Sequence, residues 1–154
     1  MIKKYGVHFH QGTPATNDLD KWFSRTQGGL LVLDDLMEES GNNKHVLELF
    51  TKDSHYRRIT VIYLIQYLFP PGKHSKTISR NAHYIMAFTN PRDQTGIQIL
   101  MRQMFPTHWR DSLEVYNKAT SRPFGYLMID LHPASDDTYR LFTNILRHEH
   151  PPAT

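Results

Sequence analysis

The 154-residue sequence contains no cysteine. This absence excludes disulfide bridges, thiolate zinc sites and cysteine nucleophiles, and it is typical of proteins in a reducing interior. Long apolar runs are also missing, because none approaches the roughly 18 residues that suggest a membrane-spanning helix. The longest run, Val61 to Leu68, is interrupted by Gln66, and no apolar block follows the first residues. We therefore expect neither a membrane span nor a signal peptide.

The composition is that of a folded protein. Hydrophobic residues make up 39% of the chain and charged residues 21%, which is typical of a globular domain rather than a disordered segment. The length is enough for one domain with a buried core. The sequence shows no internal repeat, and we expect one domain over residues 1–148 with a flexible tail over residues 149–154.

The net charge of +3 is unevenly placed along the chain. The segment Lys52–Arg92 holds seven basic residues and one acid, a net +6, so the rest of the chain sums to −3. A local basic patch of this kind is a candidate contact for nucleic acid or for nucleotide phosphate, and the alternative is a solvated basic face. The residues from this segment that we single out for nucleic acid are Arg57, Arg58, Lys73, Lys76 and Arg80.

Hydrophobic periodicity predicts the secondary structure. Four apolar segments are candidate strands: 30–33, 59–65, 83–88 and 124–131. Helices are expected over residues 43–52, from about residue 91 to 105, and over residues 107–120. The unbroken apolar runs of the first two strands are typical of strands buried on both faces of a parallel sheet. This order of elements predicts a three-layer α/β fold with a large parallel component.

The second predicted helix has a clear start and a clear apolar stripe. Asn90 is expected to cap it, with Pro91 as its first residue and Asp93 in the first turn. Apolar side chains then recur at helical spacing, and Pro106 ends the pattern. The stripe consists of Ile97, Leu100, Met101, Met104 and Phe105.

The strongest local signal is the run of four apolar residues before Asp34 and Asp35. A buried strand that ends in two acids is the Walker B arrangement. In an open α/β fold, such a strand delivers its acids to the carboxyl edge of the sheet, where ligands bind. The first carboxylate then holds Mg²⁺, usually through water, and the second orients or deprotonates an attacking water. The alternative is a strand followed by an aspartate that caps the next helix.

A polar residue also closes the second strand. Gln66 ends an otherwise apolar run, as does the polar sensor of P-loop motor ATPases, which contacts the γ-phosphate or the attacking water. The distance along the chain from Asp34 to Gln66 leaves room for one crossover helix, which a parallel pair requires. The alternative is a loop glutamine just past a strand end.

The chain resembles the DNA-packaging ATPases of Maverick/Polinton elements and related DNA viruses, which belong to the FtsK–HerA class of P-loop ATPases. The resemblance extends from Phe9 to Leu131, and its segments in order are LLVLDDLMEE, VLELFTKDSHYRRITVIYLIQYLF, KTISRNAHYIMAFTNPRD, ILMRQMFP and RPFGYLMIDLHP. It implies an ATP-driven ring that moves double-stranded DNA into a capsid inside a host cell, in the nucleus or the cytoplasm. The implied cofactors are ATP and Mg²⁺, and the implied partners are duplex DNA, further copies of the chain and capsid or portal proteins, with no membrane.

The resemblance also implies roles for individual residues. Asp34 matches the magnesium-associated acid, Asp35 the catalytic acid and Gln66 the polar sensor, and these three would form the nucleotide site. Relatives often carry asparagine after that glutamine, where this chain has Tyr67. Arg92 is the candidate trans-acting arginine finger, because an arginine fork can stabilise charge on phosphoryl oxygens. Arg57 and Arg58 are rivals for that role.

The sequence departs from the family in its N-terminal part. No G-x-x-x-x-G-K-[ST] string is present, and only 33 residues precede Asp34. The Gly72-Lys73 pair lies after the Walker B strand and is expected to be a loop. The expected fold is therefore a P-loop-like core without its first strand and phosphate loop, and we expect this chain alone not to bind ATP tightly. Apolar surface near Leu31, Val32 and Ile62 would then be left open.

Three hypotheses follow for the activity. The chain is a fragment or remnant of a packaging ATPase, or a non-catalytic DNA-binding or interaction module derived from one. The third hypothesis is a metal-dependent nuclease that uses Asp34 and Asp35, which is the weakest because two-metal sites need more clustered carboxylates. Two histidine pairs, His8 with His10 and His148 with His150, are weak candidates for a further metal site.

Overall fold

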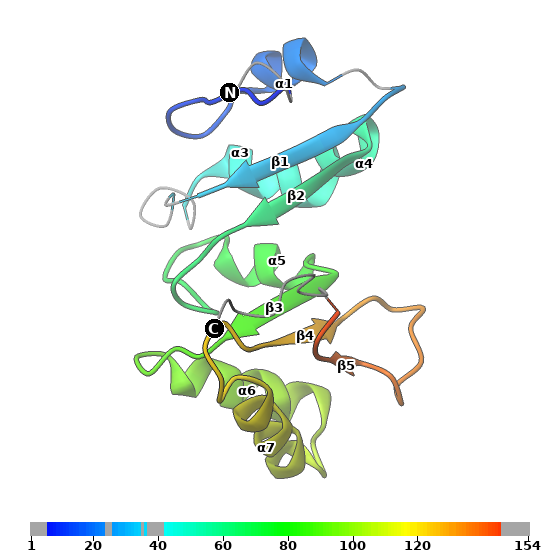
Figure 1. Cartoon of the computed structure of the whole chain (residues 1–154). Coiled ribbons are helices and arrows are strands. Elements are labelled where there is room, and N and C mark those ends of the chain that lie inside the picture. The colour runs from blue at the N-terminus through cyan, green and yellow to red at the C-terminus, as the bar shows by residue number, and fades with distance from the viewer. Residues whose placement is uncertain (1–5, 24–25, 35, 37–41, 146–154) are drawn as a thin grey trace, which may run out of the picture. The chain divides into compact units, whose positions relative to one another are not determined.

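The computed structural model describes residues 6–23, 26–34, 36 and 42–145 of the chain (Figure 1). The protein is mixed α/β and divides into two compact units, Met1–Asn81 and Ala82–Thr154. Parallel strand pairing is present in the first unit and antiparallel pairing in the second. The expected α/β class is thus confirmed, whereas the three-layer P-loop-like core is not established by these elements. The expected tail, residues 149–154, lies outside the described residues.

The first unit is built on two parallel strands. β1 (Gly29–Leu33) pairs with β2 (Ile59–Tyr63), and Leu31 lies opposite Val61. The strands alternate in burial, so one face of the pair packs into a core. That core includes Leu19 of α1 (Thr16–Trp22), Leu33 of β1, Val46 and Leu49 of the helical connection, and Ile78 of α5 (Ser75–Arg80). Helices α1 and α5 were not predicted from the sequence.

A continuous helical segment connects the two strands. It consists of α3 (Lys44–Glu48), the π-helical turn η2 (Leu49–Asp53) and α4 (Ser54–Arg57). Asn43 caps it, because the Asn43 side chain accepts a hydrogen bond of 2.9 Å from the His45 amide. The segment ends at Arg58, which adopts a left-handed conformation with φ of 53°. The predicted crossover helix over residues 43–52 is thus confirmed. In the structure the helical segment continues to Arg57, more than one turn beyond Lys52.

The other face of the β1–β2 pair carries exposed apolar side chains. Leu30, Val32, Ile62 and Leu64 are 41–55% exposed. The prediction of open apolar surface holds for Val32 and Ile62, whereas Leu31 lies on the opposite face and packs against the core. The expectation that both faces of these strands are buried is therefore wrong for the described residues, since their helices pack on one face.

The second unit is a three-stranded antiparallel sheet with two helices. Its strands are β3 (Tyr84–Phe88), β4 (Tyr126–Asp130) and β5 (Leu141–Phe142), in that order. The expectation of a largely parallel sheet is wrong here. The two helices expected between β3 and β4 are present, and the chain re-enters the sheet beside the end of β3, where Phe88 lies opposite Tyr126.

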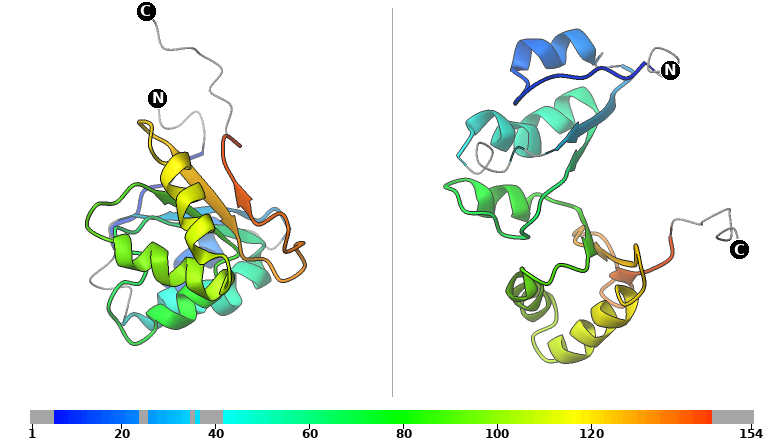
Figure 2. Two further views of the ribbon diagram at one scale, coloured as in Figure 1. Left: turned by 90° about the horizontal axis from the view of Figure 1, so that it is seen from below. Right: turned by 60° about the vertical axis from the view of Figure 1, so that its left-hand side comes forward.

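Helices α6 (Gln94–Met104) and α7 (Trp109–Ala119) lie on one side of this sheet (Figures 1 and 2). The predicted stripe of α6 is confirmed in its central part, because Ile97, Leu100 and Met101 are buried. The Tyr116 hydroxyl of α7 donates a hydrogen bond of 2.9 Å to the Phe88 carbonyl at the end of β3. This bond ties the second helix to the edge of the sheet.

The start of α6 differs from the prediction. Asp93, not Asn90, is the capping residue, and its carboxylate accepts a hydrogen bond of 3.1 Å from the Gly96 amide. The Asn90 side chain instead accepts from the Arg92 amide at 3.0 Å. Asn90 therefore forms a turn before the helix. The helix begins at Gln94, three residues after Pro91, which was the expected first residue.

Candidate functional site

The parallel pairing places Asp34 and Gln66 after the same edge of the β1–β2 sheet. Asp34 directly follows β1, and Gln66 follows β2 by three residues. The ladder continues past β2, because the Leu64 amide donates a hydrogen bond of 2.9 Å to the Leu33 carbonyl. Both residues are exposed. The carboxyl edge of parallel strands is the place where open α/β folds bind ligands.

The donor set at this edge is small. The Asp34 carboxylate makes no hydrogen bond or ion pair with any described residue. Asp35 lies outside the described residues. One free carboxylate fits Mg²⁺, which keeps most of its waters and takes one or two protein carboxylates together with substrate phosphates. A denser metal site is not found, because no group of three or more histidine, aspartate or glutamate residues gathers in the described part of the chain.

A phosphate-binding loop is not formed by Gly72 and Lys73. Residues 71–74 form bends and turns before α5, as expected for a loop. The Lys73 amide donates a hydrogen bond of 3.0 Å to the Asn42 side chain, so it is already occupied. Helix α5 has only six residues, too short for a strong dipole at its start.

Arg57 has a structural role in the first unit. Its side chain is 7% exposed and bridges two acids, Asp20 of α1 and Asp53 of η2. It donates to Asp20 from Nε at 3.0 Å and from Nη2 at 2.8 Å, and to Asp53 from Nη1. Burial lowers the pKa of Arg57, but the hydrogen bonds and charges of both acids outweigh it and raise that pKa. A side chain held in this way is poorly placed to reach DNA or a nucleotide.

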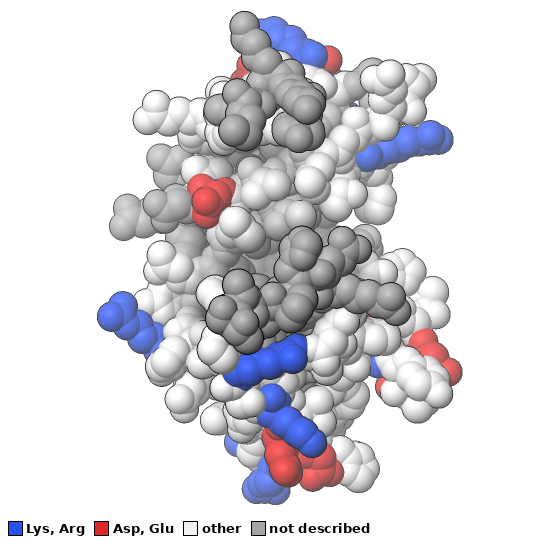
Figure 3. Space-filling model, viewed as in Figure 1, with Lys and Arg blue, Asp and Glu red and all other residues white. Residues whose placement is uncertain are grey.

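The other four residues singled out for nucleic-acid binding are exposed, namely Arg58, Lys73, Lys76 and Arg80. Arg58 precedes β2, whereas the other three follow it, in the loop before α5 and on α5 itself. Lys76 and Arg80 are four residues apart on α5, so they share one face of the helix. In the view of Figure 3, lysine and arginine lie at several separate places, and those in the lower part are mixed with aspartate and glutamate. Their role in nucleic-acid binding stays a prediction.

Arg92 lies in the turn before α6, with an exposed side chain. It belongs to the second compact unit, whereas Asp34 and Gln66 belong to the first. Its role as an arginine finger stays a prediction. Arg57 is the weaker rival, since its guanidinium is fully engaged by Asp20 and Asp53.

No protein-family model matches the chain, and comparisons with curated proteins and with solved structures also find no match. Within the described residues, no helix is long and apolar enough to cross a membrane.

The second unit contains two polar features that the sequence did not reveal. The first is a hollow of about 490 Å³ between α6, α7 and the end of β3. No charged residue lines it. Four amide side chains do so, together with hydroxyl and apolar groups, and the amides are Asn90, Gln94, Gln98 and Asn117.

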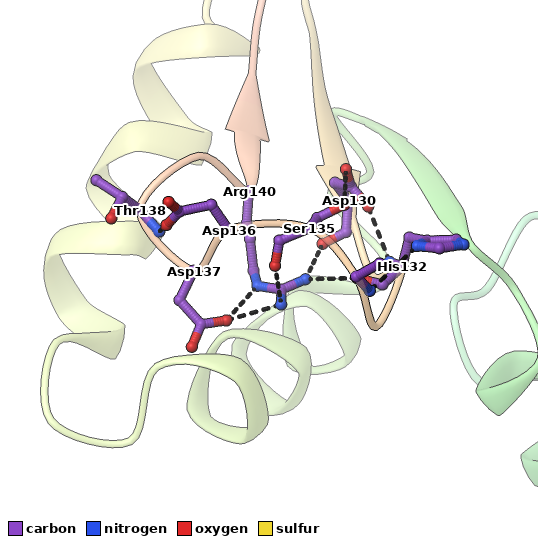
Figure 4. A network of polar contacts seen from close by, with 8 residues as sticks. Asp130, His132, Ser135, Asp136, Asp137, Thr138 and Arg140 are labelled. Carbon is purple, nitrogen blue, oxygen red and sulfur yellow. Dashed lines mark hydrogen bonds and ion pairs between the residues drawn. The ribbon is translucent and has the colours of Figure 1, made fainter.

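The second feature is a network at the end of β4, shown in Figure 4. The Asp130 carboxylate accepts from the His132 amide and from the Ser135 hydroxyl, both at 2.8 Å. These bonds, reinforced by the charge of Arg140, lower the pKa of Asp130. Arg140 in turn donates to the carbonyls of Asp130, His132 and Ser135 at 2.9–3.2 Å. The network closes the loop between β4 and β5.

Of the two histidine pairs, only His8 and His10 lie in the described part of the chain. His8 and His10 are exposed, and the His10 ring contacts the Trp22 ring with centroids 5.0 Å apart. His148 and His150 lie outside the described residues. His83 and His132 also stack, at 5.1 Å between centroids. Among the described residues, no third ligand joins any of these rings.

Proposed function

We propose that this chain is a fragment or remnant of an ATP-driven motor that packages or translocates double-stranded DNA. The observation that supports the proposal is the parallel pairing of β1 and β2, the two strands that precede Asp34 and Gln66, so that both strands end at the same sheet edge. A P-loop motor needs this juxtaposition, because the magnesium-associated acid and the polar sensor act on one nucleotide. The ordered segments of the sequence that resemble packaging ATPases support the same assignment.

Each residue of the proposed site has a distinct task. Asp34, exposed at the strand end, would hold a water-coordinated Mg²⁺ beside the nucleotide. Asp35 would orient and deprotonate the attacking water, and Gln66 would hold that water through its amide. Magnesium, when bound, supplies positive charge next to the phosphates. Arg92 of a neighbouring copy would stabilise the charge that develops on the transferred phosphoryl group.

This chain by itself is proposed to be a poor nucleotide binder. A P-loop cradles phosphates with successive backbone N–H groups, and neither a matching sequence nor a matching loop is present among the described residues. The remaining contacts to a nucleotide are one carboxylate and one amide. Such a site gains too little to offset the desolvation of a triphosphate.

The alternative is a non-catalytic DNA-binding or interaction module derived from such a motor. The exposed Lys73, Lys76 and Arg80 near α5 favour it, because they are available to a polyanion whether or not ATP is bound. Both alternatives place duplex DNA as the partner. They differ in whether the nucleotide site works once a phosphate loop is supplied.

Two titrations of the purified chain test the proposal. A labelled DNA duplex should bind with an affinity that falls steeply with salt, in the range of about 10⁻⁴ to 10⁻⁶ M that non-specific binding shows. Mg²⁺-ATP, followed by calorimetry, should show no micromolar binding. Micromolar Mg²⁺-ATP binding that is lost in Asp34→Asn, but kept in the exposed control Glu114→Gln, would contradict the role assigned to the missing loop.

The genetic context separates the two alternatives. An in-frame G-x-x-x-x-G-K-[ST] upstream of Met1 would favour the enzyme, and a stop codon there would favour the module. An absence of DNA binding at low salt would contradict both.

A further inference from the structure

Two arginines, one at the end of α6 and one at the start of α7, lie over the same tryptophan ring. The guanidinium carbon of Arg102, in the last turn of α6, lies 4.2 Å from the centroid of the Trp109 ring. That of Arg110, in the first turn of α7, lies 4.6 Å from the same ring. Both arginines are exposed, and Trp109 is half-buried. Two exposed cations thus contact the same aromatic ring.

These charges have no counter-ion in the described part of the chain. Neither Arg102 nor Arg110 forms an ion pair with a described carboxylate. The nearby Asp111 pairs with His108 instead, at 3.4 Å. The contacts with the ring hold both cations at the surface without neutralising their charge. Both charges are therefore available to an external anion.

The contact with the ring also restrains the donors. A guanidinium held over an indole ring by a cation–π contact samples fewer positions than an unrestrained side chain. Because the side chains are already restrained, less side-chain entropy is lost when an anion binds. Phosphate oxygens match such forks better than a single carboxylate does.

The site fits an extended anion rather than a small one. Small ligands bind in concave sites, and the hollow of this unit is lined by other residues, with neither arginine among them. Two exposed cations on a helical connection suit a backbone that carries many phosphates. We propose that Arg102, Trp109 and Arg110 form a contact for the phosphate backbone of double-stranded DNA. This inference rests on the proposed function and names one surface that meets the DNA.

Binding of a fluorescein-labelled 20-base-pair duplex to the full chain, followed by anisotropy at several salt concentrations, tests this surface. The double variant Arg102→Gln/Arg110→Gln should bind about tenfold more weakly or worse, as expected for lost charged hydrogen bonds. The slope of log K against log salt should fall by about 2, because two phosphate contacts are removed. The control Lys21→Gln/Lys118→Gln removes the same charge elsewhere on the exposed surface and should change both quantities much less.

Tryptophan emission gives a second readout that does not depend on overall charge. The chain has two tryptophans, so Trp22→Phe leaves Trp109 as the sole tryptophan, which is excited selectively at wavelengths too long for tyrosine. DNA should change the emission of that variant with the same midpoint as the anisotropy. Arg102→Lys/Arg110→Lys keeps both charges but loses the planar forks, and it should bind with intermediate affinity.

The outcomes separate this inference from the proposed function. Wild-type DNA binding that the glutamine pair leaves unchanged in affinity and salt slope would overturn the surface alone. Emission changes caused by inorganic phosphate or ATP at micromolar concentration, but not by DNA, would also overturn it and point to a small anion. Wild-type protein that binds no DNA would overturn both proposals.

Discussion

Each compact unit has an apolar strand that ends in an aspartate, and the two aspartates have opposite surroundings. Asp34 follows Leu30–Leu33 in the first unit, and Asp130 ends β4 in the second. Asp34 is exposed and makes no polar contact with the described residues. Asp130 is 8% exposed and is satisfied by His132 and Ser135. The same sequence pattern thus gives an exposed carboxylate in one unit and a buried carboxylate that stabilises a loop in the other.

The strand arrangement accounts for part of this contrast. β1 has a parallel partner, and the connection to that partner leaves from its carboxyl end, so the acid lies at a sheet edge. β4 has antiparallel partners on both sides, and the short connection to β5 folds back over its end. The carboxylate is then needed to bond the loop's amide and hydroxyl. An acid that is fully used in this way is not available for Mg²⁺.

The largest effects are expected from the two separate cores. Leu49→Ala in the first unit and Ile129→Ala in the second remove side chains that are at most 1% exposed, and each should destabilise its unit by about 2–5 kcal/mol. Hydrogen exchange should rise mainly in the mutated unit. If both variants accelerate exchange equally across the whole chain, the two units form one cooperative domain, as the single-domain expectation for residues 1–148 requires.

A smaller loss is expected at the ion-pair cluster of the first unit. Arg57→Met keeps much of the side-chain volume but leaves Asp53 and Asp20 without their shared cation, which should cost about 1–3 kcal/mol. Urea denaturation measures this loss. Arg58→Met, at the neighbouring exposed position, is the matched control and should be nearly neutral. Equal stability of both variants would show that the cluster does not stabilise the unit.

The hydrogen-bonded Asp130 carboxylate of the second unit should make the stability of the protein depend on pH. The pKa of Asp130 lies below its ordinary value of 3.8 in the folded protein, so its contribution is present above that pH and is lost as the pH falls through the lower, folded value. Asp130→Asn should therefore lower the thermal midpoint at pH 7. The difference from wild type should shrink below pH 3.8. A difference that stays constant down to pH 2 would contradict the assigned hydrogen bonds.

The smallest effects are expected on the exposed face of the β1–β2 pair. Val32→Thr/Ile62→Thr should change stability by less than about 1 kcal/mol, because both side chains are 41–49% exposed, and it should reduce aggregation. Leu33→Thr on the packed face should cost clearly more, since Leu33 is 3% exposed. Light scattering and thermal unfolding measure the two effects. Similar losses of stability in the two variants would show that the face with Val32 and Ile62 is also buried.

The sequence predicted the elements better than their arrangement. Apolar runs and helical stripes located β1, β2, β3, β4, α6 and α7, because burial leaves its period in the sequence. The direction of β4 was missed, since buried parallel and antiparallel strands can both be continuous apolar runs. Short elements such as α5 and β5 carry too few residues for a period. The cap at Asp93 was missed because Asn90 offers an equally good side chain three residues earlier.

The candidate site was predicted only in part. Asp34 and Gln66 could be singled out because each follows an apolar run, and their role in a nucleotide site stays a prediction. The burial of Arg57 depends on Asp20, which lies 37 residues away in the chain and gives no local signal. The contact of Arg102 and Arg110 with the Trp109 ring likewise depends on how the chain turns at Pro106, so composition alone did not reveal it.

Distances between pairs of spin labels test the parallel edge most directly, and the cysteine-free chain allows labels at chosen positions without background. One pair joins Asp34→Cys to Gln66→Cys, and the other joins Asp34→Cys to Thr60→Cys, near the opposite end of β2. Pulsed electron paramagnetic resonance should give the shorter distance for the 34–66 pair. A shorter distance for the 34–60 pair would mean that Asp34 and Gln66 do not share an edge, and the proposed nucleotide site would be lost.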